Sequence, residues 1–180
     1  MRKLIIGAVT AVALLGAPAA AGAAAAPGPT PITDPLGSGS PNGSITLPAG
    51  SSCAFAVDIA VVTNKEIQDV TTLADGSTVT KISGTLVLNF KNHTTGKTIK
   101  EDVSGSATRT LSADLSSGTF QGQGPNWLAF GPHGQANTGE PGLVFIRGRV
   151  TVKFAIVKQV FTIQKFSLSG SQQNGCTLLS

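Results

Sequence analysis

The stretch LVFIRGRVTVKF, from Leu143 to Phe154, alternates apolar and polar residues with a period of two. From Arg147 onward every odd-numbered residue of the stretch is polar, whereas the even-numbered residues are apolar apart from Gly148. Successive side chains of a β-strand point to opposite faces of a sheet, so this pattern predicts a strand with one face in a core. The predicted core face comprises Val144, Ile146, Val150, Val152 and Phe154.

The same alternation recurs along the chain and predicts an all-β protein. FAVDIAVV (55–62) and KISGTLVLNF (81–90) each place alternate apolar side chains on one face, and both are rich in β-branched residues. Beyond the N-terminal region, no stretch has the pattern of a capped amphipathic helix. We predict about eight strands, at 53–63, 66–73, 77–90, 98–110, 118–124, 126–130, 143–156 and 160–170.

The turns between these strands are short, which predicts an antiparallel up-and-down meander. Asp75 and Gly76 form a two-residue hairpin signal. Residues 92–97 suit a longer hairpin with Gly96 in the left-handed conformation, and residues 114–119 have a similar composition. A meander of this kind has to close on itself or cover its edge strands.

The two cysteines suggest how the meander closes. An even cysteine count in an exported protein favours a disulfide, so we predict a bridge between Cys53 and Cys176. Cys53 begins the first predicted strand and Cys176 follows the last, and a bridge requires Cα atoms within about 7 Å. We therefore predict a closed barrel, with a β-sandwich as the alternative. Glycines inside the predicted strands would permit bends or bulges, and these are Gly84, Gly105, Gly122 and Gly148.

The N-terminal region has the layout of a secretory signal peptide. Arg2 and Lys3 precede an apolar run at 4–15, and small residues follow it. The run is shorter than the roughly 20 residues that a membrane span needs. We predict a signal peptide at 1–25, a disordered Pro/Gly/Ser-rich linker at 26–46 and a single barrel domain at 47–180. The expected location is extracellular, with no stable membrane insertion after cleavage.

Charge and composition exclude nucleic acid as an expected partner. The chain has 13 basic and 9 acidic residues, and two of the basic residues lie in the predicted signal peptide. The sequence contains no run of Lys or Arg, no tyrosine and a single tryptophan. Proteins that bind single-stranded nucleic acid combine basic patches with stacking aromatic side chains, and this chain offers neither.

Four segments resemble a group of small secreted β-rich proteins from actinobacteria, most of them uncharacterised. The segments are LPAGSSCAFAV (47–57), SGTLVLNFKNHTTGK (83–97), EPGLVFIRGRV (140–150) and CTLL (176–179). The resemblance implies a secreted β-rich domain and brings no catalytic residues with it. In shape alone, a closed meander is also similar to lipocalin-like and allene-oxide-cyclase-like barrels, and such an analogy of fold does not imply a function.

The stretch GPNWLAFGPHGQANTGEPG (124–142) is the strongest candidate for a binding region. It contains the only tryptophan of the chain. We predict a short strand at 126–130 and a loop at 131–142 that lies at one mouth of the barrel. Barrel mouths are common ligand sites. The predicted binding residues are Trp127, Phe130, His133 and Glu140.

The remaining sequence carries no motif of known chemistry. It has no Gly-x-Ser-x-Gly elbow, no HExxH or His-x-His ligand pair and no phosphate-binding loop followed by lysine. Metal sites need clustered ligands, which the sequence does not show. The sequence therefore predicts no catalytic residue, no metal and no cofactor.

Three functional hypotheses follow from these observations. The favoured one is a secreted, non-enzymatic binding or interaction module whose partner is a small apolar ligand or an extracellular protein. The first alternative is a barrel enzyme of the cyclase or isomerase type, whose lumen would hold convergent polar groups such as Asp58, Glu101 or Arg109. The second alternative is a structural or inhibitory extracellular protein that works through its exposed surface.

Overall fold

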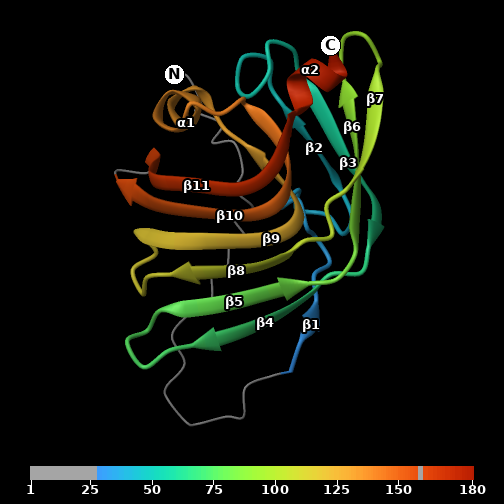
Figure 1. Ribbon diagram of the computed structural model, residues 1–180. Coiled ribbons are helices and arrows are strands. Elements are labelled where there is room, and N and C mark those ends of the chain that lie inside the picture. Colours follow the sequence, from blue (N-terminus) through green and yellow to red (C-terminus); the bar gives the residue numbers. More distant parts are fainter. Residues whose placement is uncertain (1–27, 158–159) are drawn as a thin grey trace.

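A computed structural model describes residues 28–157 and 160–180, and its strands run antiparallel. Within these residues lie eleven strands and two short helices (Figure 1). In chain order they are β1 (Thr30–Pro31), β2 (Ser44–Leu47), β3 (Val57–Asn64), β4 (Ile67–Thr72), β5 (Thr78–Ser83), β6 (Leu86–Asn92), β7 (Thr98–Asp102), β8 (Ser106–Leu111), β9 (Ser117–Ala129), α1 (Pro132–Thr138), β10 (Leu143–Val157), β11 (Val160–Asn174) and α2 (Gly175–Leu179).

The strands form two sheets and not the closed barrel that the sequence predicted. Sheet A has the order β1-β4-β5-β8-β9-β10-β11, and sheet B has the order β2-β3-β6-β7. Among the described residues neither sheet closes on itself, and the arrangement is sandwich-like, as in the predicted alternative. Figure 1 shows the upper ends of β9, β10 and β11 curving toward sheet B, while β4, β5 and β8 extend away from it. The all-β, antiparallel prediction is confirmed.

Two of the predicted strands are each divided between the two sheets. The predicted strand at 77–90 is divided into β5 and β6, and the one at 98–110 into β7 and β8. β5 and β8 pair in sheet A, whereas β6 and β7 pair in sheet B. Gly84 lies at the first division with φ +123, and a Cβ there would stand 2.3 Å from the carbonyl oxygen of Lys65. Glycine is therefore required for the chain to turn here.

The last three strands bend at a row of glycines. Gly124, Gly148 and Gly170 are direct cross-strand partners in β9, β10 and β11. Their φ angles are +89°, +151° and +131°, in a region that L-residues rarely adopt. Gly148 was predicted to be such a bend. Gly122 was also predicted as a bend, but it instead packs under the side chain of Val150, where a Cβ would approach to 3.0 Å.

We expect alanine at position 148 to destabilise the protein by about 1–3 kcal/mol, since the backbone conformation is unfavourable for any side chain. The added Cβ would also lie 2.2 Å from the carbonyl oxygen of Ser169. Gly131→Ala is the matched control, because Gly131 has a φ of −68° and open space around it. Urea unfolding measures both variants. Equal losses in the two variants would show that the glycine row does not set the bend.

Two apolar clusters lie on opposite faces of β10, which explains a departure from the predicted pattern. By parity, Leu143 and Phe145 lie on the face opposite the predicted core face, yet they are 0% and 3% exposed. Sheet B covers this end of β10, so these side chains join the inter-sheet core with Val57, Ile59 and Phe90. The predicted core face packs on the other side. Its cluster contains Val144, Ile146, Val150 and Val152, with Phe120, Phe166 and Leu168 against it.

The Gly/Pro-rich stretch at 124–142 is organised differently from the prediction. The predicted strands at 118–124 and 126–130 form one continuous strand, β9. The predicted loop at 131–142 contains helix α1, with Pro132 at its first turn and Gly139 as its left-handed C-cap, φ +73. Proline at the start and glycine past the end are ordinary helix boundary signals. The segment is too short for periodicity to reveal a helix.

The N-terminal part of the described chain packs against both sheets. The predicted signal peptide at 1–25 lies outside the described residues. The predicted disordered linker at 26–46 contributes β1 and most of β2, and its Leu36 is only 3% exposed. Burial alone would raise the pKa of Asp34, but hydrogen bonds from the backbone N–H groups of Ser38 and Gly39 hold this pKa below its usual value. This Asp34 turn gives the segment a defined path.

The predicted disulfide between Cys53 and Cys176 is present, with its Cα atoms 5.5 Å apart. It joins the chain just before β3 to helix α2, which follows β11. The bridge therefore ties the two sheets together at one end, where Figure 1 shows α2 lying above β3 and β6. Of the helices in the described ranges, neither has the length and apolar character needed to cross a membrane.

Candidate functional site

A pocket of about 250 Å³ lies at the bend, between sheet A and the N-terminal segment 31–35. Its walls are mostly apolar, and they include Ile82, Leu86, Val103, Ala107 and Leu128. Several polar and aromatic side chains join these walls. They are Thr33, Asp34, Glu66, Gln68, Arg109, Phe120, Asn126 and Trp127. An apolar pocket with a few polar groups is the usual composition of a small-molecule site.

Strand register places Arg109 on the apolar face of sheet A. In β8, Arg109 is the cross-strand partner of Thr80 in β5 and of Phe120 in β9. Phe120 is in turn opposite Val152, which belongs to the core of β10. The guanidinium therefore stands in a row of core positions, and burial lowers the pKa of Arg109.

Glu66 enters the same pocket from the bend between β3 and β4. Its side chain is buried, with the residue 8% exposed, and burial raises the pKa of Glu66 to about 7. The backbone N–H of Glu66 donates to Oδ1 of Asn64 at 3.0 Å, and its carbonyl accepts from the N–H of Ile32 at 2.9 Å. These bonds fix the backbone of Glu66 beside the pocket, and its carboxyl group at the pocket wall is partly neutral at pH 7.

Asn64 holds the N-terminal segment over the pocket. Its Nδ2 donates to the carbonyl oxygen of Ile32 at 2.6 Å and to Oδ1 of Asn42 at 3.0 Å. Ile32 lies in the stretch 31–35 that lines the pocket. Part of the segment that the sequence predicted to be a disordered linker, residues 31–35, thus forms one wall of the candidate site.

Trp127 is the predicted binding residue that lines this pocket. Its ring meets that of Phe90 edge to face, with the centroids 5.5 Å apart, so it also belongs to the inter-sheet core. Phe130 is 4% exposed and packs edge to face against Phe166. Glu140 follows α1 and is half-buried, outside the residues that line the pocket. His133 lies in α1, and its side chain is outside the described part of the structure.

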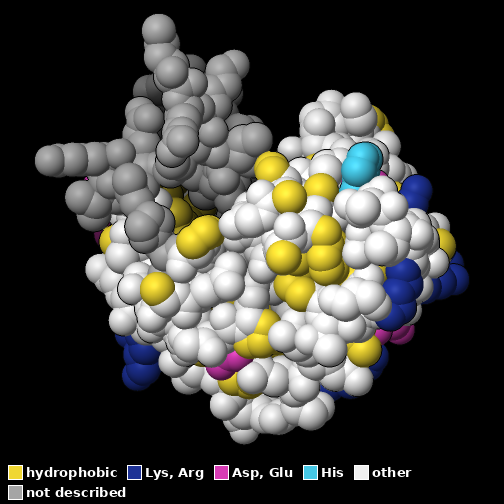
Figure 2. Space-filling model, turned by 90° about the horizontal axis from the view of Figure 1, so that it is seen from above, with side chains coloured by type: hydrophobic (Ala, Val, Ile, Leu, Met, Phe, Trp, Pro, Cys, Tyr) yellow, Lys and Arg dark blue, Asp and Glu magenta, His cyan; other side chains and the backbone are white. Residues whose placement is uncertain are grey.

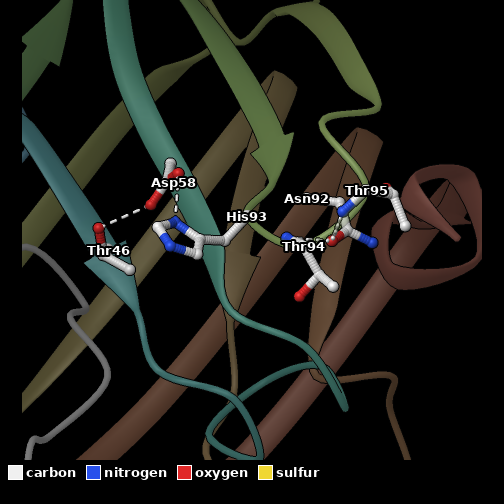
Figure 3. A network of polar contacts seen from close by, with 6 residues as sticks. All are labelled: Thr46, Asp58, Asn92, His93, Thr94 and Thr95. Carbon is white, nitrogen blue, oxygen red and sulfur yellow. Dashed lines mark hydrogen bonds and ion pairs between the residues drawn. The ribbon is translucent and has the colours of Figure 1, made fainter.

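The polar residues that the enzyme hypothesis placed in a lumen are separated in the structure. Arg109 lines the pocket, but Asp58 lies on the surface of sheet B, where it accepts hydrogen bonds from Thr46 at 2.8 Å and interacts with Nδ1 of His93 at 2.9 Å (Figure 3). The interaction with His93, followed by that with Thr46, lowers the pKa of Asp58. Glu101 pairs with Arg147 at 3.2 Å across the two sheets.

These ion pairs belong to the molecular surface. The side chain of His93 is 65% exposed and that of Arg147 is 55% exposed. In the view from above in Figure 2, Lys and Arg side chains lie toward the edges and hydrophobic side chains gather between them. Exposed pairs of this kind contribute little to stability. The charged residues that line the pocket are Asp34, Glu66 and Arg109, and the amide of Asn126 joins them.

Sequence reasoning did not find Glu66 or Asn126. Glu66 follows Lys65 at a strand boundary, and no local pattern shows that the chain changes sheets there. Asn126 could have been found, because it shares the face of Leu128 in β9 and so interrupts an apolar row. In the described ranges, no three His, Cys, Asp or Glu side chains come together as a metal site would require.

No protein-family model matches the chain, and no curated protein or solved structure shows significant similarity to it.

We expect Glu66→Gln to stabilise the protein at pH 8 and to leave its stability unchanged at pH 4. In the unfolded chain the carboxyl ionises near its usual pKa of 4.5, whereas in the folded chain it ionises near 7. The wild type therefore loses stability as the pH rises from 4.5 to 7, and glutamine removes this loss. Because the pocket is open to solvent, we expect an effect of only about 1–2 kcal/mol. Urea unfolding at pH 4, 6 and 8 measures it.

Asp114→Asn provides a control of opposite sign. Hydrogen bonds from Ser112 and then Ser116 lower the pKa of Asp114 to about 2. This variant should be less stable than the wild type at pH 7, and the difference should vanish as the pH falls through the range from 4 to 2. If Glu66→Gln changed the free energy of unfolding by the same amount at every pH, the pKa of Glu66 would not be raised by burial.

Proposed function

We propose that the protein is an extracellular binding protein whose pocket holds a small, largely apolar molecule with one anionic group. The observation that carries the proposal is the position of Arg109 on an apolar face, at the wall of the pocket. A guanidinium presents a planar fork of N–H donors that fits a carboxylate. Export is supported by the signal-like N-terminal sequence and by the disulfide, since such bonds persist mainly in oxidising compartments.

The size and chemistry of the pocket narrow the ligand class. Its volume of about 250 Å³ lies just below the range of roughly 300–1,000 Å³ that is typical of drug-sized ligands. The walls favour an aliphatic or compact aromatic body, while a carboxylate would meet Arg109. The amide of Asn126, and the carboxyl of Glu66 where it is protonated, would then donate hydrogen bonds to the remaining lone pairs of the same carboxylate. A medium-chain carboxylic acid satisfies all of these requirements.

We expect octanoate to raise the melting temperature, and octanol and octylamine to have smaller effects. The three probes share one chain and differ in charge, so thermal shift and isothermal titration isolate the contribution of the carboxylate. Arg109→Gln should weaken octanoate binding by about tenfold or more, since a hydrogen-bonded charged pair is worth about 1.5–3 kcal/mol.

Arg147→Gln is the matched control for Arg109→Gln, because the side chain of Arg147 is 55% exposed, pairs with Glu101 and lies outside the residues that line the pocket. This variant should bind octanoate as the wild type does. Equal binding of the three probes, or an equal loss in both arginine variants, would reject the proposed anionic ligand.

Glu66 supports a second candidate, an enzyme that transfers a proton within a bound ligand. A general base works best when its pKa lies near the operating pH, and the pKa of Glu66 is about 7. The ionised carboxylate of Glu66 would remove a proton from the carbon beside a carbonyl group, while Arg109 stabilises the developing negative charge.

Deuterium exchange distinguishes this enzyme from a simple binding protein. With 2-oxooctanoate in D₂O, an enzyme would exchange the hydrogens at C3 faster than buffer does, and Glu66→Gln would remove the acceleration while retaining binding. Exchange at the buffer rate in the presence of the wild type would leave only the binding function.

A further inference from the structure

The outer face of sheet A, opposite the pocket, carries two adjoining hollows of about 570 and 490 Å³. They share Gln123 and Arg149, so together they form one shallow groove that crosses the strands. We call this surface the outer groove. Besides the two shared residues, its walls include Lys81, Ser106, Thr151 and Ser169.

Strand register arranges the outer groove as parallel polar rows. One row crosses the sheet from β8 to β11 through the cross-strand partners Ser106, Gln123, Arg149 and Ser169. Ser83 of β5 extends this row, because it follows Ile82, the partner of Ala107. The next row contains Lys81, Thr108, Gln121, Thr151 and Ser167. Five strands at about 4.8 Å spacing span about 19 Å. The outer groove therefore offers hydroxyl, amide and cationic groups at regular intervals along an extended path.

The same face concentrates positive charge. Lys81, Arg149, Lys153 and Lys165 point outward, and Asp69, the partner of Lys81 in β4, is the one acidic residue on these rows. This gives the face a net charge of +3, whereas residues 28–180 as a whole, with eleven basic and nine acidic residues, carry only +2. Lys153 and Lys165 are direct cross-strand partners, an arrangement that is unfavourable without an anion nearby.

Several polar side chains of the outer groove lack hydrogen bonds to one another. Among the described residues, no side-chain hydrogen bond involves Gln121, Gln123 or Ser169, and none of the four cations forms an ion pair. Elsewhere on the surface, charged side chains form ion pairs, as Glu101 does with Arg147. The donors and acceptors of the outer groove are therefore available to an external ligand.

We propose that the outer groove binds an extended anionic polysaccharide. Its carboxylate groups would meet Lys81 and Arg149 in the groove wall and the pair Lys153 and Lys165, which lies beyond the wall on the same face. Its hydroxyl groups would exchange hydrogen bonds with the glutamine and serine side chains. A nucleic acid fits less well, because the groove walls contain no aromatic side chain on which bases could stack. A protein partner fits less well, because the groove offers no large apolar anchor of the kind that dominates protein interfaces.

Isothermal titration with a hyaluronate octasaccharide tests the proposal. We expect the wild type to bind hyaluronate and not a neutral dextran oligosaccharide. The triple variant Arg149→Gln/Lys153→Gln/Lys165→Gln should bind about tenfold more weakly. The matched control is Lys65→Gln/Lys91→Gln/Lys100→Gln, which removes the same charge from exposed positions elsewhere and should change the affinity by less than about twofold.

A further variant separates recognition of the sugar from attraction of charge. Gln123→Ala should weaken binding of hyaluronate and leave binding of inorganic polyphosphate unchanged. Several results would overturn the proposal. They are no binding of hyaluronate, an equal loss in both triple variants, or an oligothymidylate that binds as tightly as hyaluronate with the same dependence on the three cations.

Discussion

Replacing both Cys53 and Cys176 by serine is expected to lower the free energy of unfolding by about 4–5 kcal/mol, because the bridge closes a loop with a sequence separation of 123. In the chain-entropy view, the unfolded state regains the freedom that this long loop removes. The bridge also holds α2 against the chain ahead of β3, so its loss should loosen the end at which the two sheets meet. Fluorescence of the single tryptophan, Trp127, reports unfolding in urea.

A reduced wild type serves as the control for this double variant. Treatment with a thiol reductant should lower the unfolding midpoint to that of the serine variant and should leave the midpoint of the variant itself unchanged. A serine variant as stable as the oxidised wild type would show that the two sheets hold together without the bridge.

Phe90→Ala is expected to destabilise the protein by about 3–5 kcal/mol, the usual cost of removing a fully buried aromatic side chain. Phe90 is 0% exposed, and its ring makes edge-to-face contacts with Phe145 at 4.8 Å and Trp127 at 5.5 Å between centroids. It joins sheet B to β9 and β10 of sheet A, so a cavity here weakens the contact between the sheets. Thermal or urea unfolding measures the loss.

Two comparison variants locate this effect in the inter-sheet core. Phe90→Leu retains part of the volume and should cost clearly less than alanine. Leu73→Ala removes an apolar side chain that is 45% exposed in the β4–β5 turn, and it should change stability by less than about 1 kcal/mol. A loss of similar size at positions 73 and 90 would contradict a core that is centred on Phe90.

Local sequence patterns predicted most of the strands and two of the turns. The alternation at 143–154 placed Val144, Ile146, Val150, Val152 and Phe154 in a core, and all five are buried. Gly76 and Gly96 adopt positive φ in the predicted hairpins. The turn at 114–119 differs, because the left-handed residue there is Leu115, with φ +58, and not a glycine.

The division into two sheets could not be read from the sequence. Periodicity shows which face of a strand is buried, but it does not show which element covers that face. Gly84 and Gly148 were predicted as bends, yet a bend inside one barrel and a bend between two sheets leave the same local signal. Only long-range pairing, such as that of β3 with β6, separates the two architectures.

The candidate site was predictable only in part, for the same reason. Trp127 was predicted to bind a ligand, and Arg109 was named as a group that could face a lumen. Both line the pocket. Glu66 reaches the pocket because β3 and β4 lie in different sheets, and the wall at 31–35 reaches it because Asn64 binds Ile32. These are tertiary contacts that no local pattern encodes.

NMR of the protein with octanoate can show whether the pocket at the bend binds a small apolar acid. Intermolecular NOEs identify the protons that lie beside the ligand. We expect NOEs from the aliphatic chain of octanoate to the ring protons of Trp127 and Phe120, which line the pocket. At the same octanoate concentration, below saturation, these NOEs should be much weaker in Arg109→Gln. NOEs confined to other residues, or none at saturating octanoate, would contradict binding in this pocket.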